Sequence, residues 1–143
     1  MTDAECDALN RDCALAMGLV EGVDFGTWDE HDVREGWDDE TRSSMVWCER
    51  CRRDGPPFNG PCIVPPPDYV RDPIARDHMW EWLFAFQIIE EVSIVSRRLG
   101  VFSCIVLYAV GGVGECVAGA GSTRGEAIAR AVLAVAKVLK VGG

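Results

Sequence analysis

Residues 101–131 read VFSCIVLYAVGGVGECVAGAGSTRGEAIARA. The run Val101–Val110 is rich in β-branched and aromatic residues, which favour strands. The glycine-rich residues Gly111–Gly114 predict a turn, and Glu115–Ala120 predict a second strand. Two strands joined by a short glycine-rich turn form a hairpin. This stretch therefore predicts an antiparallel hairpin that leads into a helix.

The last helix begins at a polar turn that offers two caps. Thr123 and Glu126 have the spacing of a capping box, and Ser122 is the alternative cap. Apolar residues then recur at helical spacing up to Leu139. We expect this broad apolar face to cover the sheet.

Two further helices are expected ahead of the hairpin. Thr2 and Glu5 form a capping box for a helix over Asp3–Met17, which Gly18 closes. Asp72-Pro73 combines an N-cap acid with proline at the first helical position, and the run up to Leu99 has helix-forming composition. Because β-branched residues accumulate at Val92–Val95, an earlier end of this helix is the alternative.

The predicted order is helix, irregular or short-strand region, long helix, β-hairpin and C-terminal helix. This order is typical of an α+β fold, with a small antiparallel sheet sandwiched or covered by helices. The chain has 143 residues, and we expect a single domain over 1–143. An acidic segment at about 22–69, rich in cysteine, tryptophan and proline, lacks a sustained period. Short strands are expected there around Ser44–Cys48 and Cys62–Val64.

The net charge is −9, and residues 1–54 carry all of it. An acidic surface repels duplex nucleic acid, so that partner is not expected. No apolar stretch has membrane-spanning length, because Trp82–Val95 is interrupted by polar residues. The acidic N-terminus also lacks the features of a signal peptide. We therefore expect a cytoplasmic protein without a membrane partner.

The turn before the last helix is the main candidate for ligand binding. Gly121 allows close approach of a ligand, and the helix start directs free N–H groups and a partial positive charge at the turn. Ser122 and Thr123 add hydroxyl donors, and Arg124 adds a guanidinium that can grip a phosphate. An anion, above all a phosphate, fits this combination. The alternative is an ordinary helix cap.

A zinc site is the second candidate. Cys48 and Cys51 have the spacing of paired zinc ligands, and Cys62 follows in the same segment. Either His31 or His78 would have to complete the set. The alternative is a group of loop thiols without metal. Zinc is the one cofactor that the sequence suggests.

The other four cysteines lie in apolar periodic segments, and we expect all of them to be small buried hydrophobes. They are Cys6, Cys13, Cys104 and Cys116. No pairing of a nucleophile with a base emerges from the sequence, so no enzymatic activity is expected.

The layout resembles the phage ABA-sandwich proteins, a family of Thoeris anti-defence proteins. Ala16-Met17-Gly18 ends the first helix, and Pro66–Tyr69 leads into the helix at Asp72. The most specific part is the terminal helix Thr123–Ala131, with the pattern Thr-Arg-x-Glu-Ala-Ile-Ala-Arg-Ala. The acidic, cysteine-bearing insertion around Glu30–Pro61 departs from the family pattern.

The resemblance implies a sponge for cyclic nucleotide immune signals. Such a protein would sequester glycocyclic ADP-ribose or cyclic oligonucleotides in the host cytoplasm without cleaving them. It would form homo-oligomers, namely dimers that can assemble into hexamers, with pockets between subunits. Thr123 and Arg124 would contact phosphate, Arg130 would serve a neighbouring pocket, and Phe102 or Tyr108 would stack on a base. The two aromatic residues are chosen by residue type alone.

Two alternatives belong to other functional classes. A degenerate double-stranded RNA binding module also carries Gly-x-Gly before an alanine-rich helix, but the lysine cluster of that module is missing here. A protein-interaction inhibitor would instead use the acidic run Asp29–Glu40 on a basic partner. A solvated acidic loop is the simpler interpretation of this run.

Overall fold

A computed structural model describes residues 1–142 and divides the chain into two compact units. The helix–sheet unit comprises Met1–Leu19 and the chain from Pro66 onward, and the cysteine unit comprises Val20–Pro65. The cysteine unit coincides closely with the segment at about 22–69 in which the sequence suggested little regular structure. The chain is thus organised as two units, whereas the sequence suggested one domain with an irregular segment.

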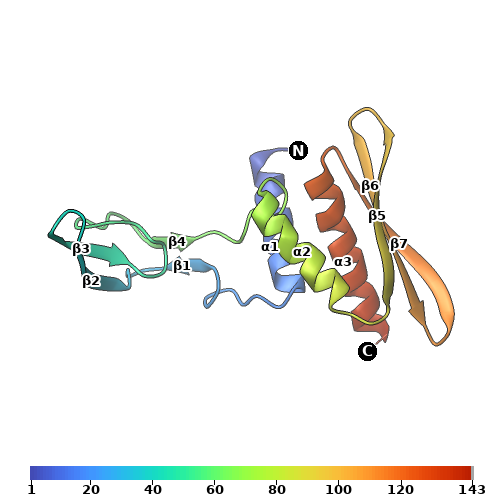
Figure 1. Cartoon of the computed structure of the whole chain (residues 1–143), viewed down its shortest axis with the longest axis horizontal. Coiled ribbons are helices and arrows are strands. Elements are labelled where there is room, and N and C mark those ends of the chain that lie inside the picture. The colour runs from blue at the N-terminus through green and yellow to red at the C-terminus, as the bar shows by residue number, and fades with distance from the viewer. Residues whose placement is uncertain (143) are drawn as a thin grey trace. The chain divides into compact units, whose positions relative to one another are not determined.

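The helix–sheet unit contains three helices and three strands (Figure 1). In chain order they are α1 (Asp3–Ala16), α2 (Pro73–Phe84), β5 (Ile89–Arg98), β6 (Val101–Val110), β7 (Val113–Gly121) and α3 (Arg124–Gly142). The strands form one antiparallel sheet in the order β5-β6-β7. The predicted α+β class is therefore confirmed.

Helix α3 is the centre of this unit. It packs against β6 and β7 on one side and against α1 and α2 on the other, so the helices form two layers on one face of the sheet (Figure 1). Its buried apolar residues are small or β-branched, which allows both layers to approach closely. They are Ala127, Ile128, Ala129, Ala131, Val132 and Val135.

The helix starts follow their sequence signals. The capping box of Thr2 and Glu5 is present at α1, which ends at Ala16 with Met17 as its cap. At α2 the Asp72 carboxylate accepts a hydrogen bond from the N–H of Ile74 at 3.0 Å. These local signals were sufficient because a cap involves residues only two or three positions apart.

The expected long helix up to Leu99 is wrong. Helix α2 ends at Phe84, and the chain continues as β5, which adds a third strand to the predicted hairpin. Val92 lies opposite Val106 and Ile94 opposite Cys104 in this pairing. Pairing with β6 satisfies the backbone hydrogen bonds of the run and partly buries Val92 and Ile94, which outweighs the preference of its other residues for a helix.

The hairpin of β6 and β7 is confirmed. Gly111 and Gly112 form its turn with φ values of 61° and 82°, a conformation that suits glycine at both positions. Of the four cysteines expected to be buried, Cys116 is exposed. Cys116 lies opposite Leu107. Side chains alternate between the two faces of the sheet, and Cys104 is buried on the face that α3 covers, whereas Leu107 and Cys116 lie on the other face.

The cysteine unit contains two short antiparallel pairs. Strand β1 (Gly26–Trp28) pairs with β4 (Cys62–Val64), and β2 (Val33–Asp38) pairs with β3 (Ser43–Cys48). The short strands expected around residues 44–48 and 62–64 are confirmed. The buried apolar side chains described in this unit are few, namely Phe25, Cys48 and Cys62.

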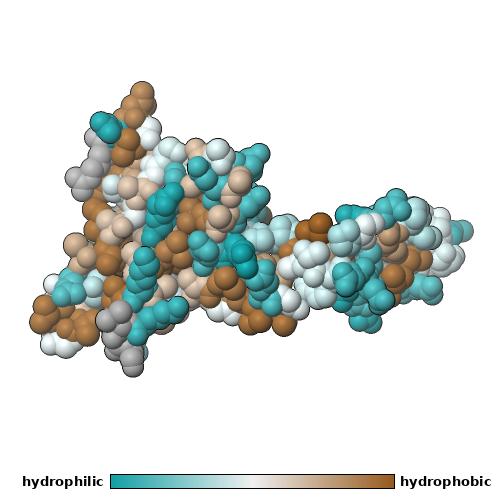
Figure 2. Space-filling view, turned by 180° about the vertical axis from the view of Figure 1, so that it is seen from behind, coloured by the Kyte–Doolittle hydropathy of each residue, from teal (hydrophilic) through white to brown (hydrophobic). Residues whose placement is uncertain are grey.

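The surface of the helix–sheet unit is mixed in character. Figure 2 shows brown apolar side chains interspersed with teal hydrophilic ones on the face turned to the viewer. None of the described helices combines the length and apolar character that crossing a bilayer requires.

Candidate functional site

Four side chains of metal-binding type converge in the cysteine unit. The side-chain ligand atoms of His31, Cys48, Cys51 and Cys62 all lie within 4.8 Å of one another. All the cysteines are free thiols, so no disulfide competes for these sulfur atoms. The cluster contains three sulfur donors and one imidazole nitrogen, a donor set typical of zinc.

The two strand pairs bring these residues together through their register. Cys48 ends β3 and lies opposite Val33, two residues after His31. Cys62 begins β4 and lies opposite Trp28, the last residue of β1. His31 lies in the short connection from β1 to β2, so both cysteines are next to the ends of this connection. Cys51 lies in the turn after β3, where the Arg52 N–H donates to the Cys48 carbonyl at 2.9 Å. Residues distant in sequence thus meet where the two pairs join.

Two of the separations are close to the edges of a tetrahedral zinc site. The sulfur atoms of Cys48 and Cys62 are 3.6 Å apart, and the Cys51 sulfur lies 3.5 Å from Nδ1 of His31. Zn–S and Zn–N bonds of normal length imply edges of about 3.8 Å and about 3.5 Å in a tetrahedron. The first separation is also far too long for a disulfide bond of about 2.05 Å.

The His31 ring is oriented through its second nitrogen. Nε2 lies 3.2 Å from the carbonyl oxygen of Gly60, and the Phe58 ring lies 5.0 Å from the imidazole, centroid to centroid. A hydrogen bond from Nε2–H to this carbonyl leaves Nδ1 free to act as the ligand. Such support of a ligating histidine by a backbone carbonyl is common in metal sites.

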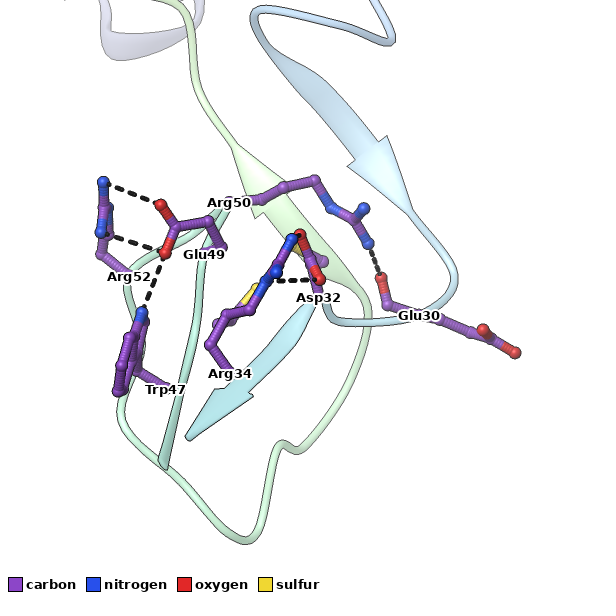
Figure 3. A network of polar contacts seen from close by, with 9 residues as sticks. Glu30, Asp32, Arg34, Trp47, Glu49, Arg50 and Arg52 are labelled. Atoms are coloured by element: carbon purple, nitrogen blue, oxygen red, sulfur yellow. Dashed lines mark hydrogen bonds and ion pairs between the residues drawn. The ribbon is translucent and has the colours of Figure 1, made fainter. Parts of the chain in front are cut away.

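Arg50 holds the loop that carries His31. Its guanidinium lies 4.9 Å from the centroid of the Trp28 ring and donates a hydrogen bond to the carbonyl of Glu30 (Figure 3). The cation–π contact and the hydrogen bond together link the turn between Cys48 and Cys51 to the loop before His31.

A second group of contacts braces β3 and the following turn. The Glu49 carboxylate accepts a hydrogen bond from the Trp47 indole at 3.0 Å and pairs with Arg52 at 3.4 Å (Figure 3). On β2, the guanidinium of Arg34 pairs with the carboxylate of Asp32 at 3.3 Å. Both ion pairs are largely exposed, so each contributes little stability by itself.

The thiols of the cluster perturb one another. Burial raises the pKa of Cys48, but hydrogen bonds from the Cys51 backbone and the His31 ring outweigh it and hold the pKa below its ordinary value. Burial raises the pKa of Cys62, and the neighbouring Cys48 and Cys51 add to this effect although Arg50 opposes it. Negative charge on one sulfur therefore disfavours charge on the next, an effect that a divalent cation would relieve.

The structure brings together all three predicted zinc-ligating cysteines and selects His31 as the fourth residue. His78 is exposed on α2, in the helix–sheet unit. The Cys-x-x-Cys spacing identified the first pair of ligands from the sequence. Choosing between the two histidines required the register of β1 with β4 and of β2 with β3.

The predicted anion turn before α3 is occupied by the chain's own carboxylate. Glu126 accepts hydrogen bonds from the backbone N–H of Ser122 at 2.7 Å and from its hydroxyl at 3.1 Å. The Thr123 hydroxyl accepts from the N–H of Glu126 at 3.1 Å, and Arg130 donates to the same carboxylate at 3.3 Å. The helix-cap interpretation therefore accounts for these donors.

The glycines of this region serve packing between elements. A β-carbon on Gly119 would lie 2.3 Å from the backbone nitrogen of Ala131 in α3, and one on Gly121 would lie 2.6 Å from the Glu126 side chain. A β-carbon on Gly125 would lie 2.0 Å from the Val70 carbonyl oxygen. These residues are glycine because no larger residue fits without displacing its neighbours.

The remaining predicted ligand residues lie at two places. The Arg124 guanidinium lies 5.9 Å from the centroid of the Phe102 ring, beside Gly121 at the end of β7. Tyr108 is buried near the other end of β6, where its hydroxyl donates to Glu115 at 2.9 Å. Because six residues of strand separate Phe102 from Tyr108, the two rings are about 20 Å apart along β6.

A cavity of about 340 Å³ adjoins the start of α3. Arg71 and Arg76 line it together with Ser122, Thr123 and Glu126. Further lining comes from Met1, Cys6 and Val70. Arg71 pairs with Asp3 at 2.6 Å, whereas Arg76 donates to the Val70 carbonyl at 3.3 Å and its Nε is buried without a partner. Sequence analysis missed both arginines because they precede or begin another helix.

Comparisons with known proteins identify no relative. No family model matches the chain, and neither a curated protein nor a solved structure matches it either.

Proposed function

We propose that the cysteine unit is a zinc-binding module in which His31, Cys48, Cys51 and Cys62 hold a structural Zn²⁺. The observation that carries this proposal is the convergence of four ligand atoms within 4.8 Å. Zinc would supply charge neutralisation for the thiolates and a rigid link between the two strand pairs.

The donor set favours a structural role over a catalytic one. Four protein ligands complete a tetrahedral zinc, whereas a catalytic zinc keeps one position for water or substrate. Three thiolates and one imidazole also satisfy the preference of zinc better than that of magnesium or calcium, which bind oxygen ligands. The metal would therefore stabilise the cysteine unit and take no part in a reaction itself.

The small core of the cysteine unit supports the same role. Beyond two of the ligands themselves, Phe25 is the buried large apolar side chain described in it. Units of this size rarely gain enough stability from apolar burial alone and often depend on disulfides or metals. With its cysteines free, this unit would obtain that stability from the metal.

The proposal is tested by metal analysis of the purified protein and by titration with Co²⁺. We expect about one zinc per chain and an intense thiolate-to-cobalt charge-transfer band. Cys48→Ser and Cys62→Ser should weaken binding more than about hundredfold, because even residues behind the ligands have effects of this order. Cys116→Ser is the matched control, since Cys116 is exposed on the sheet.

The two histidines of the chain provide a second matched pair. His31→Gln should weaken cobalt binding and alter the charge-transfer spectrum, whereas His78→Gln should leave both unchanged. Protein without zinc and without a thiolate band on cobalt titration would refute the proposal.

A second candidate function is retention of an anionic nucleotide signal without cleavage, as the family resemblance implies. The cavity beside the start of α3 favours it, because Arg76 lines this cavity and no carboxylate of the described residues forms an ion pair with it. The phosphate would then contact Arg76 and the hydroxyl hydrogen of Thr123, because the backbone N–H and hydroxyl of Ser122 already donate to Glu126. Assembly into a homo-oligomer belongs to the same proposal.

Native mass spectrometry and ligand recovery test this second function. A panel of cyclic nucleotides should raise the melting temperature, and denaturation should release the nucleotide intact. Arg76→Gln should weaken binding, whereas Arg98→Gln, which removes an exposed charge from β5, should not. Absence of binding across the panel, or recovery of cleaved product, would contradict sequestration.

A further inference from the structure

A groove of about 690 Å³ lies among the three helices of the helix–sheet unit and shares no lining residue with the cavity at the start of α3. Its walls are the C-terminal ends of α1 and α2, and its floor is the second half of α3. The lining is mostly apolar: Leu15, Ala16, Met17, Gly18, Trp82, Phe86, Leu133, Ala136 and Leu139, with Asp12, Lys137 and Lys140 as the charged residues. Its volume is in the usual range for small-molecule sites.

The aromatic wall of the groove is preorganised. The rings of Trp82 and Phe86 meet edge to face, with centroids 4.9 Å apart and an interplanar angle of 78°. Leu15 on the opposite wall is 43% exposed. An apolar body placed here would remove aromatic and aliphatic surface from water at little cost in side-chain order.

The charges of the groove are unequal. Lys137 and Lys140 are the two lysines of the chain, and both line this groove. Neither forms an ion pair with the described residues. Among the described lining residues Asp12 is the one carboxylate, so they carry an excess of positive charge in a chain whose net charge is −9.

We propose that this groove binds a small amphiphilic anion, with an apolar or aromatic body against Trp82 and Phe86 and an anionic group at Lys137 and Lys140. The lysines project from one helix three residues apart, so one anionic group can contact both. Charge complementarity selects an anion over a neutral molecule of equal shape. A carboxylate, sulfonate or phosphate end group would satisfy the same chemistry.

The experiment uses the full-length protein and two pairs of probes that differ in charge. The first pair is 1-anilinonaphthalene-8-sulfonate and its uncharged relative N-phenyl-1-naphthylamine, and the second is laurate and dodecanol. Fluorescence titration of the first pair, and displacement of the bound fluorescent probe by the second pair, should show saturable binding of the two anions, at least about tenfold tighter than that of their neutral partners. The difference should shrink as salt is added.

Variants then test which charges are responsible. The double variant Lys137→Gln, Lys140→Gln should weaken binding of both anions on the order of tenfold and leave the neutral probes unchanged. Arg98→Gln removes a positive charge from the sheet and should change neither. The near-ultraviolet circular dichroism of each variant should match that of the wild type, which establishes that the probes bind to folded protein.

Lysine reactivity gives an independent measurement at the site. Laurate should slow reductive methylation of Lys137 and Lys140, measured by mass spectrometry, while the N-terminal amine reacts at its normal rate. Equal affinity for anionic and neutral probes, or insensitivity to the double variant, would overturn the proposal. Protection of the lysines that depends on protein concentration rather than on laurate would instead assign the groove to a second copy of the chain, and would overturn it too.

Discussion

The carbonyl oxygen of Val70 occupies the space into which a β-carbon on Gly125 would project, at a separation of 2.0 Å. The N–H of Val70 in turn donates to Asn10 of α1 at 3.2 Å. Through this one residue, the chain that leads into α2 is fixed to α1 and to the first turn of α3. Gly125 is therefore a packing residue at a junction of three helices.

Gly125→Ala should destabilise the helix–sheet unit by about 3 kcal/mol, because the new methyl group meets backbone that has little freedom to move. The gain of about 1 kcal/mol in helix propensity does not offset this cost. Gly114→Ala is the control: it has no atom within 4 Å of the added carbon and should change stability by less than about 0.5 kcal/mol. Chemical denaturation of both variants measures the difference, and equal stabilities would refute the packing role.

Glu126→Gln should lower stability at neutral pH by about 1 kcal/mol, since the carboxylate caps α3 and pairs with Arg130. Burial raises the pKa of Glu126, but hydrogen bonds from the Ser122 backbone and hydroxyl and the interaction with Arg130 outweigh it and lower the pKa below 4.5.

Because its folded-state pKa is lowered, Glu126 stabilises the fold fully above about pH 4.5, and this contribution disappears as the pH falls through the folded value. The difference in unfolding free energy between wild type and Glu126→Gln should therefore shrink as the pH falls below the pKa of a free carboxyl group. Denaturant unfolding at a series of pH values measures it. A difference that grows on acidification would contradict the assignment.

Removal of zinc should unfold the cysteine unit and leave the helix–sheet unit intact. The first unit has a minimal apolar core, whereas the second buries its own core around α3. Hydrogen exchange with and without a chelator should show faster exchange within Val20–Pro65 alone. Uniform exchange with and without the chelator would show that the metal has no structural role.

Arg50→Lys should weaken metal binding by about tenfold. Lysine keeps the positive charge, but it lacks the planar guanidinium that stacks on Trp28 and donates a hydrogen bond to the Glu30 carbonyl. Arg42→Lys, on the turn between β2 and β3, is the control and should have no effect. Competition with a chromophoric chelator measures both affinities. Equal affinities would mean that Arg50 does not position the His31 loop.

Alkylation of the zinc-loaded native protein should modify Cys116 first, since this thiol is exposed. Burial raises the pKa of Cys13 to about 12 and that of Cys104 to about 11, so both should be unreactive at pH 8. Addition of a chelator should then release Cys48, Cys51 and Cys62 to the reagent. Peptide mass mapping over time gives the order, and early modification of these three in the loaded protein would argue against bound metal.

Local sequence patterns predicted the elements whose signals lie within a few residues. The caps at Thr2 and Asp72, the turn at Gly111–Gly112 and the Cys-x-x-Cys pair all behave as expected, because each depends on neighbours in the chain. The composition of the run that forms β5 favours a helix when the run is considered by itself, and only its pairing with β6 makes it a strand. The role of Ser122 and Thr123 stayed open between a bound anion and a helix cap, because their distance from the Glu126 carboxylate depends on the folded turn.

The amino-acid sequence alone determined the α+β class, the hairpin and the three cysteines of the candidate metal site. These depend on composition, period and short spacing, which a linear chain displays directly. The tertiary structure alone decided that His31 rather than His78 joins the cysteines, that Glu126 fills the turn before α3, and that both lysines face one apolar groove. The reason is physical: each of these depends on contacts between segments far apart in sequence, and strand register and helix packing bring such segments together only in the folded chain.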